Sequence, residues 1–326
     1  MLKLSKANFL KAKSFIFEHG EEIDRSVFQY YFEDLSAAAF LDTLSKYQYP
    51  NGGFGGLWHE FDYRGPCLKS TEIAVKYILG MKERPSHRLP IIQNTMEYLL
   101  EAYLPERGNW GEVVVPQVND GIHCHWSRWR GEDNSPIADR VERVRNYDAN
   151  EKACFAAFVS EYPELVTKDL YDEIIYYPVE HILRHWDHRS PGYDAKLFDK
   201  DCPYPFEYLH NFVVHLKDSV LVKNLSEILC QQPRAFMELN YALSDTDYVH
   251  LPCDNINSPE SVIYPAVKEL VDESLDHRIT QQAEDGRWPL GWSFGNDAAF
   301  RELQMKYEVH LTLSTLLKLQ AFNRLT

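Results

Sequence analysis

The stretch Gln281–Trp288 reads QQAEDGRW, and the stretch Gln48–Phe54 reads QYPNGGF. In both, a glutamine is followed four residues later by a glycine and six residues later by a large aromatic residue. A glycine can turn at positive φ after a helix, the aromatic ring can pack on the next helix, and the glutamine amide can bond carbonyls that a helix end leaves unpaired. We therefore interpret both stretches as one scaffold turn used twice.

Helical spacing of apolar residues dominates the rest of the chain. It predicts helices over residues 37–47, 70–81, 89–104, 150–162, 170–186, 219–231, 261–282 and 310–322, and an amphipathic helix at the amino terminus. The best strand-like run is 111–118, and long aromatic loops are expected at 51–69, 105–149 and 283–309. Weaker copies of the turn, without the glutamine, occur at Gly108-Asn109-Trp110 and Gly192-Tyr193.

Repeated helical hairpins with the same turn predict an all-α fold in which the hairpins close into a ring. No low-complexity linker divides the sequence, so residues 1–326 are expected to form a single domain.

Composition narrows the classes of function. The formal net charge of -15 argues against a nucleic-acid partner, because phosphate neutralisation needs a surface rich in Lys and Arg. No run approaches the roughly 20 apolar residues that span a bilayer, so no membrane span is expected. The six cysteines are dispersed without paired spacing, which suits reduced thiols and predicts a cytoplasmic protein.

The two turns and the segments around them resemble the terpenoid-cyclase and protein-prenyltransferase superfamily. Its QW repeat is a glutamine, a short spacer and Gly-x-Trp, and the carboxyl end, QQAEDGRWPLGWSFG followed by HLTLSTLLKL, is similar to the closing repeat of single-domain bacterial prenyltransferase and squalene-oxidase-repeat proteins. The resemblance covers the chain from about residue 36. It implies an α/α toroid and a small apolar, isoprenoid-type ligand in the central cavity.

The acid motif of the class II cyclases in that superfamily is incomplete here. Those enzymes protonate an alkene with Asp-x-Asp-Asp, in which one carboxylic acid is kept protonated in a dry cavity. The nearest string is Asp245-Thr246-Asp247-Tyr248, which lacks the last aspartate. Asp245 and Asp247 are therefore candidates for substrate binding, with a solvated turn as the plainer alternative.

Two aromatic loop segments carry the candidate acid–base groups. In the segment WHEFDY, Glu60 and Asp62 lie two residues apart, so both can point to one side of an extended loop. The segment His123-Cys124-His125-Trp126 follows Asp120 and is the densest mixture of reactive side chains. We expect Glu60, Asp62, Asp120 and His123 to be catalytic, and we expect these side chains to contact substrate: Trp58, His125, Trp126, Trp288 and Trp292.

A metal centre is not expected. Zinc needs three or four ligands, and a set drawn from His123, His125, Cys253 and Asp254 departs from the prenyltransferase pattern, because Cys253 directly precedes Asp254. The Asp-Asp-x-x-Asp motif for magnesium and diphosphate does not occur, and neither does a Walker loop or a Rossmann fingerprint. The sequence thus predicts no cofactor.

Three functions stay open at this point. The first is a terpene-cyclase-like enzyme or isoprenoid-binding protein acting on a small apolar ligand. The second is a carbohydrate-active hydrolase or lyase on an α/α barrel, which would use paired carboxylates beside stacking aromatics. The third is a non-catalytic ring that binds a protein partner. A closed apolar chamber would favour the first, an open cleft with many hydrogen-bonding groups the second, and a filled centre the third.

Overall fold

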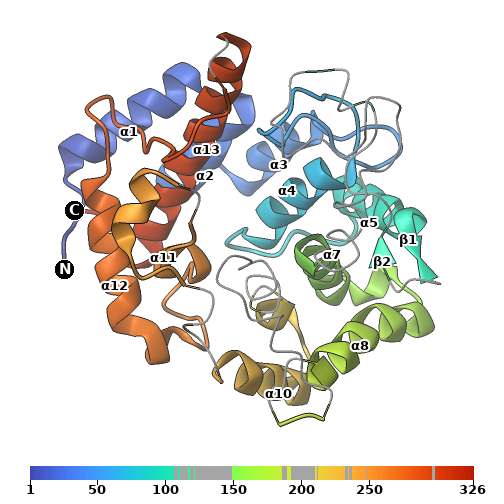
Figure 1. Cartoon of the computed structure of the whole chain (residues 1–326). Coiled ribbons are helices and arrows are strands. Elements are labelled where there is room, and N and C mark those ends of the chain that lie inside the picture. The colour runs from blue at the N-terminus through green and yellow to red at the C-terminus, as the bar shows by residue number, and fades with distance from the viewer. Residues whose placement is uncertain are drawn as a thin grey trace.

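The computed structural model is all-α, as the sequence predicts, with its helices following one another around a centre in the view of Figure 1. It describes residues 1–105, 109–110, 117, 121, 149–185, 189–191, 210, 212–231, 234, 237–247, 249–295 and 298–326. The α/α toroid, with an inner and an outer ring of helices, stays a prediction.

The helices of the amino-terminal half are α1 (Lys6–His19), α2 (Glu22–Phe32), α3 (Ala37–Ser45), α4 (Leu68–Leu79), α5 (Pro90–Ala102) and α7 (Ala149–Glu161). Those of the carboxyl-terminal half are α8 (Lys168–His185), α10 (Ser219–Leu229), α11 (Pro252–Asn255), α12 (Tyr264–Thr280) and α13 (Ala298–Ala321), with short 3₁₀ turns η4 (Pro163–Leu165) and η6 (Tyr241–Asp245). Strands β1 (Tyr103–Leu104) and β2 (Asn109–Trp110) form one small antiparallel pair.

The predicted helices agree with the observed ones to within a few residues at most ends, but the predicted loop at 283–309 is wrong in its second half. Helix α13 begins at Ala298, not near residue 310. Its first turns are rich in polar and charged residues, and the apolar spacing becomes dense only after Val309. Leu303 in this segment is buried against Phe294 in a small apolar cluster that is separate from the main core.

The first copy of the turn connects α3 to α4. Gly52 lies at φ +87°, and a Cβ there would lie 2.0 Å from the carbonyl oxygen of Asn94, so only glycine allows α5 to approach this closely. Gln48 Nε2 donates to the carbonyl oxygen of Ile91 on α5 (3.2 Å) and to that of Gly52 (3.1 Å). The fully buried Phe54 donates its backbone N–H to Thr71 Oγ1 on α4 (3.0 Å).

The second copy connects α12 to α13 with the same contacts. Gly286 lies at φ +98°, and a Cβ there would lie 2.3 Å from the backbone carbon of Lys11 on α1. Gln282 Nε2 donates to the carbonyl oxygens of Asn8 on α1 (3.0 Å) and Gly286 (2.8 Å). Trp288 N donates to Thr312 Oγ1 on α13 (3.1 Å). The glutamines therefore bond the neighbouring helix and their own turn, whereas the sequence predicts a bond to carbonyls that a helix end leaves unpaired.

Trp110 makes one contact of the same kind as Trp288. The Trp288 indole donates to the carbonyl oxygen of Arg278 on α12 (2.6 Å), and the Trp110 indole donates to that of Leu99 on α5 (2.8 Å). Both side chains are buried and tied to the helix that precedes them. This contact supports the weaker copy at residues 108–110, whereas Gly192-Tyr193 lies outside the described residues.

The two ends of the chain meet. Leu4 pairs with Leu325 in a parallel bridge, and its backbone N–H donates to the carbonyl oxygen of Arg324 (2.7 Å). The Arg324 guanidinium donates to Asp272 Oδ1 on α12 (2.9 Å). Helix α1 thus packs beside the turn at Gly286 as α5 packs beside the turn at Gly52. The contacts of α1 join the beginning of the chain to its end.

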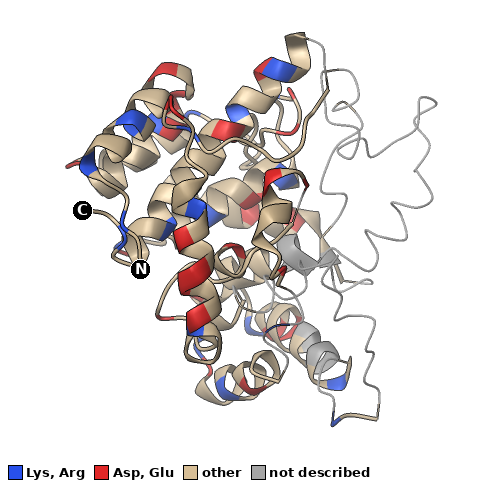
Figure 2. Ribbon diagram, turned by 60° about the vertical axis from the view of Figure 1, so that its left-hand side comes forward, with Lys and Arg blue, Asp and Glu red and all other residues tan. Residues whose placement is uncertain are grey.

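Charged residues are spread over the described helices, with acidic and basic side chains intermixed (Figure 2). Among the described residues, none of the helices combines the length and the apolar character that crossing a bilayer requires.

Removing the Trp288 side chain should destabilise the fold. The Trp288→Ala variant is expected to lose about 3–5 kcal/mol of unfolding free energy, because it leaves a large cavity and removes the indole donor to the Arg278 carbonyl oxygen. Denaturant unfolding measures the loss. Tyr176→Ala, at a side chain on α8 that is exposed, serves as the control and should lose far less. A Trp288→Ala protein of unchanged stability would show that the scaffold assignment is wrong.

Candidate functional site: a charged pocket beside helices α11, α12 and α13

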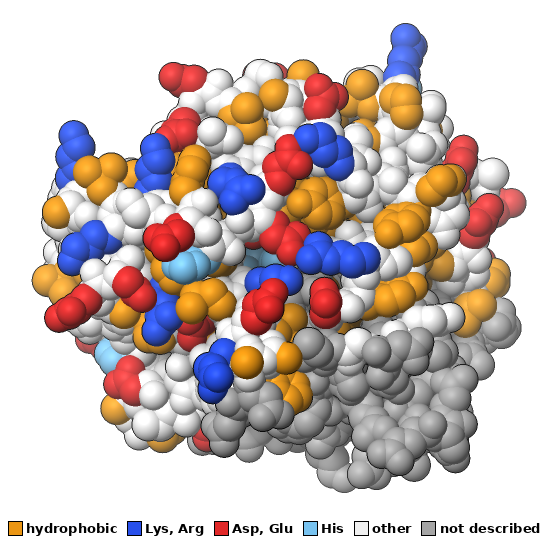
Figure 3. Space-filling view, turned by 90° about the horizontal axis from the view of Figure 1, so that it is seen from above, with side chains coloured by type: hydrophobic (Ala, Val, Ile, Leu, Met, Phe, Trp, Pro, Cys, Tyr) orange, Lys and Arg blue, Asp and Glu red, His pale blue; other side chains and the backbone are white. Residues whose placement is uncertain are grey.

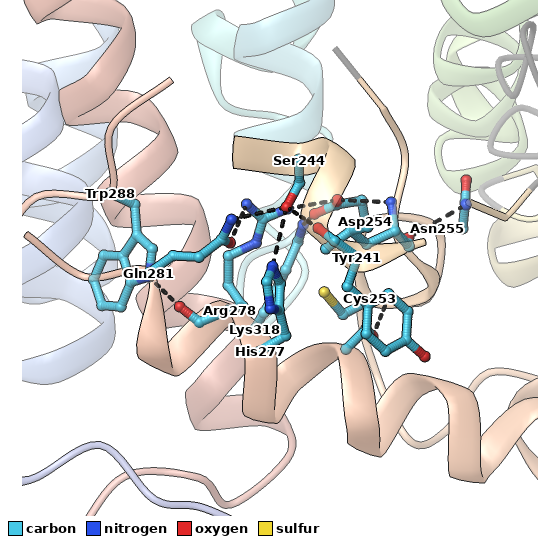
Figure 4. A network of polar contacts seen from close by, with 12 residues as sticks. Tyr241, Ser244, Cys253, Asp254, Asn255, His277, Arg278, Gln281, Trp288 and Lys318 are labelled. Carbon is cyan, nitrogen blue, oxygen red and sulfur yellow. Dashed lines mark hydrogen bonds and ion pairs between the residues drawn. The ribbon is translucent and has the colours of Figure 1, made fainter. Parts of the chain in front are cut away.

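A pocket of about 240 Å³ lies beside α11, α12 and α13. It is smaller than the roughly 300–1,000 Å³ of typical ligand sites, so it suits a small molecule or one end of a longer one. It is lined by Ser244, Asp247, Val249, His250, Asp254, Arg278, Pro289, Leu290, Gly291, Trp292, Tyr307, His310, Leu311, Ser314 and Lys318. Figure 4 shows the polar network on one side of it.

Asp254 is placed by the short helix α11. Pro252 starts this helix in a position where no backbone donor is needed, and Asp254 accepts the backbone N–H of Leu251 (3.1 Å). The next residue back, Cys253, donates its backbone N–H to Ser274 Oγ on α12 (3.0 Å). These bonds fix the Asp254 carboxylate against α12 and α13.

Two cations hold the Asp254 carboxylate. Arg278 Nη2 on α12 donates to Oδ2 (2.8 Å), and Lys318 Nζ on α13 donates to Oδ1 (2.8 Å). All three side chains are less than a fifth exposed. Burial alone would raise the pKa of Asp254, but Arg278 and Lys318 outweigh it and hold that pKa well below its usual range. The group is therefore an ionised acceptor, and the cluster carries one surplus positive charge.

Ser244 and His277 lie beside this cluster but do not form a nucleophilic pair. Ser244 Oγ donates to the carbonyl oxygen of Tyr241 (2.7 Å) and accepts from Gln281 Nε2 (2.8 Å). His277 Nε2 lies 3.2 Å from the same oxygen. Because the hydroxyl proton is already given to a backbone carbonyl, Ser244 has a structural role: it positions Gln281, which also donates to Asp245 Oδ1 (2.6 Å).

Helix α13 supplies the opposite wall. Tyr307, His310, Ser314 and Lys318 recur at three- and four-residue spacing, so they occupy one face of the helix. Burial is the main cause that lowers the pKa of His310, to about 3, and the positive charges of Lys76 and Lys318 add to it. His310 is therefore neutral near pH 7 and can accept or donate one hydrogen bond.

Of the residues predicted to bind substrate, Trp292 and Asp247 line this pocket. Trp292 is half-buried and stacks on Phe294, with ring centroids 4.9 Å apart. Asp247 and Asp245 are both exposed, as the solvated-turn alternative predicts. Trp288 does not line the pocket: its side chain is fully buried under α13, so its predicted role in substrate contact is corrected to one in packing.

The predicted pair Glu60 and Asp62 lies in the loop between α3 and α4. Asp62 borders a second cavity, together with Trp58, but this cavity has about 10 Å³, room for at most one water. Glu60 is half-buried and is not among the residues that line it. Trp58 packs under Lys69 Nζ, which lies 4.3 Å from the ring centroid.

Asp120, His123, His125 and Trp126 lie outside the described residues, so their predicted roles stay predictions. Within the described part of the chain, no three His, Cys, Asp or Glu side chains gather as a possible metal site. Both oxygens of Asp254 are occupied by cations, and burial raises the pKa of the Cys253 thiol.

Among the pocket residues that sequence reasoning missed are Arg278, Tyr307, His310 and Lys318. A signal for three of them was present, because Tyr307, His310 and Lys318 recur at helical spacing along α13. Arg278 had no such signal, since its partner Asp254 lies 24 residues away on another helix.

Comparisons with known proteins add no relative. No family model matches the chain, no curated protein matches it, and no solved structure matches it.

Neutralising Asp254 should lower the unfolding free energy of the protein near pH 7. The Asp254→Asn variant leaves Arg278 and Lys318 buried without their counter-charge, which should cost about 3–5 kcal/mol of unfolding free energy. The folded-state pKa of Asp254 is lowered, so its stabilisation is present above the unfolded value of about 3.9 and is lost as pH falls below it. The difference between the two proteins should therefore shrink below about pH 4.

Denaturant unfolding between pH 2 and pH 7, roughly the range that spans the carboxyl titrations, measures this difference. Burial raises the pKa of Glu72, but two neighbouring lysines outweigh it and lower that pKa to about 2. Glu72 is present in both proteins, so its contribution to the pH dependence cancels in the comparison. Asp247→Asn, at an exposed position, is the control. A difference between wild type and Asp254→Asn that is independent of pH would contradict the assignment of an ionised carboxylate.

Proposed function

We propose that the protein binds a small hydroxylated ligand of the carbohydrate class in the pocket beside α11, α12 and α13. The observation that carries this proposal is the combination of a charged, hydrogen-bonding side with Trp292 and Leu290 on the same pocket. A sugar ring has hydroxyl groups at its edge and C–H groups on its face, which match these two kinds of surface.

The charged side chains of the pocket favour a carbohydrate over an isoprenoid. An apolar chain in this pocket would cover Arg278, Lys318 and Asp254 without offering them hydrogen bonds, and burying charged groups in this way is costly. A hydroxylated ligand can instead accept from Lys318, which has three N–H donors and gives one to Asp254. The isoprenoid hypothesis rests on the family resemblance and on loops rich in Trp, Tyr, Asp and His.

Binding is better supported than glycoside hydrolysis. Hydrolysis needs one carboxyl group that stays protonated to donate to the leaving oxygen. Asp254 has the opposite character, because its two cationic partners keep it ionised. Asp247 lines the pocket but is exposed to solvent. The described residues therefore supply recognition groups and no general acid.

A glycan array followed by tryptophan fluorescence titration tests the proposal. We expect glycans to bind the wild-type protein, and binding to weaken at least about tenfold in Trp292→Ala, because aromatic stacking against a sugar face is lost. Trp58→Ala is the matched control, since Trp58 borders the other cavity. Farnesol, an uncharged isoprenoid, is titrated in parallel.

Two results would contradict the proposal. One is binding of farnesol with no binding of any glycan, which would favour the isoprenoid hypothesis. The other is glycan binding that Trp292→Ala leaves unchanged, which would place the sugar elsewhere on the chain.

A further inference from the structure

The pocket beside α11, α12 and α13 is long for its volume. Tyr307 and Lys318 both line it, and because a helix rises by about 1.5 Å per residue, these two positions stand roughly 16 Å apart along α13. A volume of about 240 Å³ spread over that length makes a narrow slot. A single sugar ring is too short to contact both ends of this slot, so a ligand that spans it has more than one unit.

One end of the slot is aromatic and apolar. The Trp292 and Tyr307 rings lie there with their centroids 5.8 Å apart. The backbone N–H of Leu290 donates to Glu308 Oε1 on α13 (3.2 Å), which holds the segment after the Gly286 turn against this helix. This end therefore presents an aromatic ring and an aliphatic side chain, the kind of surface on which the C–H face of a sugar ring can pack.

The other end of the slot is polar. The Arg278, Asp254 and Lys318 side chains there are each less than a fifth exposed. Ser314 and His310 stand one and two turns before Lys318 on the same face of α13. Lys318 gives one of its three N–H donors to Asp254. A hydroxyl and a neutral imidazole can each donate and accept, so this end can bond several hydroxyl groups of one ring.

The aromatic end is the more exposed of the two. Asp247 and Pro289 line the pocket and are both exposed to solvent. A Cβ at Gly291 would lie 2.3 Å from the carbonyl oxygen of Ser244, so the segments that carry these two exposed residues meet beside Trp292. Trp292 itself is half-buried. A chain that enters the slot would therefore place its end at the polar side and leave past Trp292.

We propose that the pocket recognises the end of a carbohydrate chain in two successive positions, with the terminal unit at Lys318, Ser314 and His310 and the second unit stacked on Trp292. This inference rests on the proposed function, and it adds the length and the orientation of the ligand. The pocket volume of about 240 Å³ encloses the terminal unit and part of the second, so the rest of the chain lies outside.

The experiment is a length series. Cello-, malto-, xylo- and chito-oligosaccharides of one to five units are screened on an array, and the series that binds is titrated in solution by calorimetry. We expect the disaccharide to bind about tenfold more tightly than the monosaccharide, because it adds the contact with Trp292. On the face seen in Figure 3, apolar side chains stand among acidic and basic ones. A third unit would lie outside the pocket on such a mixed surface, so it should add far less than the second.

Two variants assign the two positions. Trp292→Ala should weaken the disaccharide about tenfold and leave the monosaccharide unchanged, so that the preference for two units disappears. Lys318→Met should weaken both ligands by the same factor, so that the preference remains. Ser314→Ala repeats this second test without disturbing the ion pairs of Asp254. Trp58→Ala, at the other cavity, should change neither affinity. Circular dichroism checks that each variant is folded, and the length series of the wild type stands without any variant.

Competition tests the recognition of chain ends. The trisaccharide of the binding series should displace the disaccharide, whereas an equal mass of the soluble polysaccharide of that series, which has few ends, should displace far less of it.

The outcomes separate the two proposals. Several results would overturn the inference and leave the proposed function standing: equal affinity for one and two units, a third unit that adds as much as the second, a preference for two units that persists in Trp292→Ala, or a polysaccharide that competes as well as the trisaccharide by mass. An array without hits at any length overturns both.

Discussion

The close approach of Gly286 to α1 is the constraint on which the arrangement of the carboxyl-terminal helices depends. The turn at Gly286 leaves no space for a side chain, because a Cβ would lie 2.3 Å from the backbone of Lys11. Gln282 then bonds Asn8 on the same helix, and Trp288 is buried between α12 and α13. One backbone contact therefore sets the position of α13 relative to both α12 and α1.

The pocket inherits its geometry from this turn. Arg278 stands on the last turns of α12, and its carbonyl oxygen receives the Trp288 indole N–H while its guanidinium binds Asp254. Lys318 reaches the same carboxylate from α13. Trp288 of the scaffold turn and Asp254 on the charged side of the pocket are thus both bonded to Arg278. The scaffold turn therefore also positions the site.

The part of the fold that could be predicted from the sequence is the part set by local chemistry. The spacing of Gln282, Gly286 and Trp288 predicted a positive-φ turn and a packed aromatic ring, and both are present. The target of the glutamine was predicted wrongly, because its partner Asn8 lies 274 residues away and no local pattern encodes that contact. Similarly, the early start of α13 depends on packing of Leu303 against Phe294, which the polar sequence there conceals.

The candidate site was less predictable for the same physical reason. Trp292 and Asp247 were identified as residue types that suit a site, but the groups that define its charge meet only in three dimensions. Asp254 was considered as a metal ligand because the prenyltransferase zinc set contains Asp, Cys and His, and its partners show a different role, since both oxygens accept from cations. A sequence lists acids and bases without saying which of them neutralise one another.

Buried charge is the feature that links the fold to a ligand. Taking an ion pair out of water often costs more than the pair returns, and well-packed apolar residues can frequently replace it without loss of stability. This protein nevertheless keeps Asp254 and Glu72 largely out of water, each between two cations. Stability alone does not require that arrangement. The Asp254 cluster stands at the wall of a pocket, where its two cations can also donate hydrogen bonds to a bound ligand.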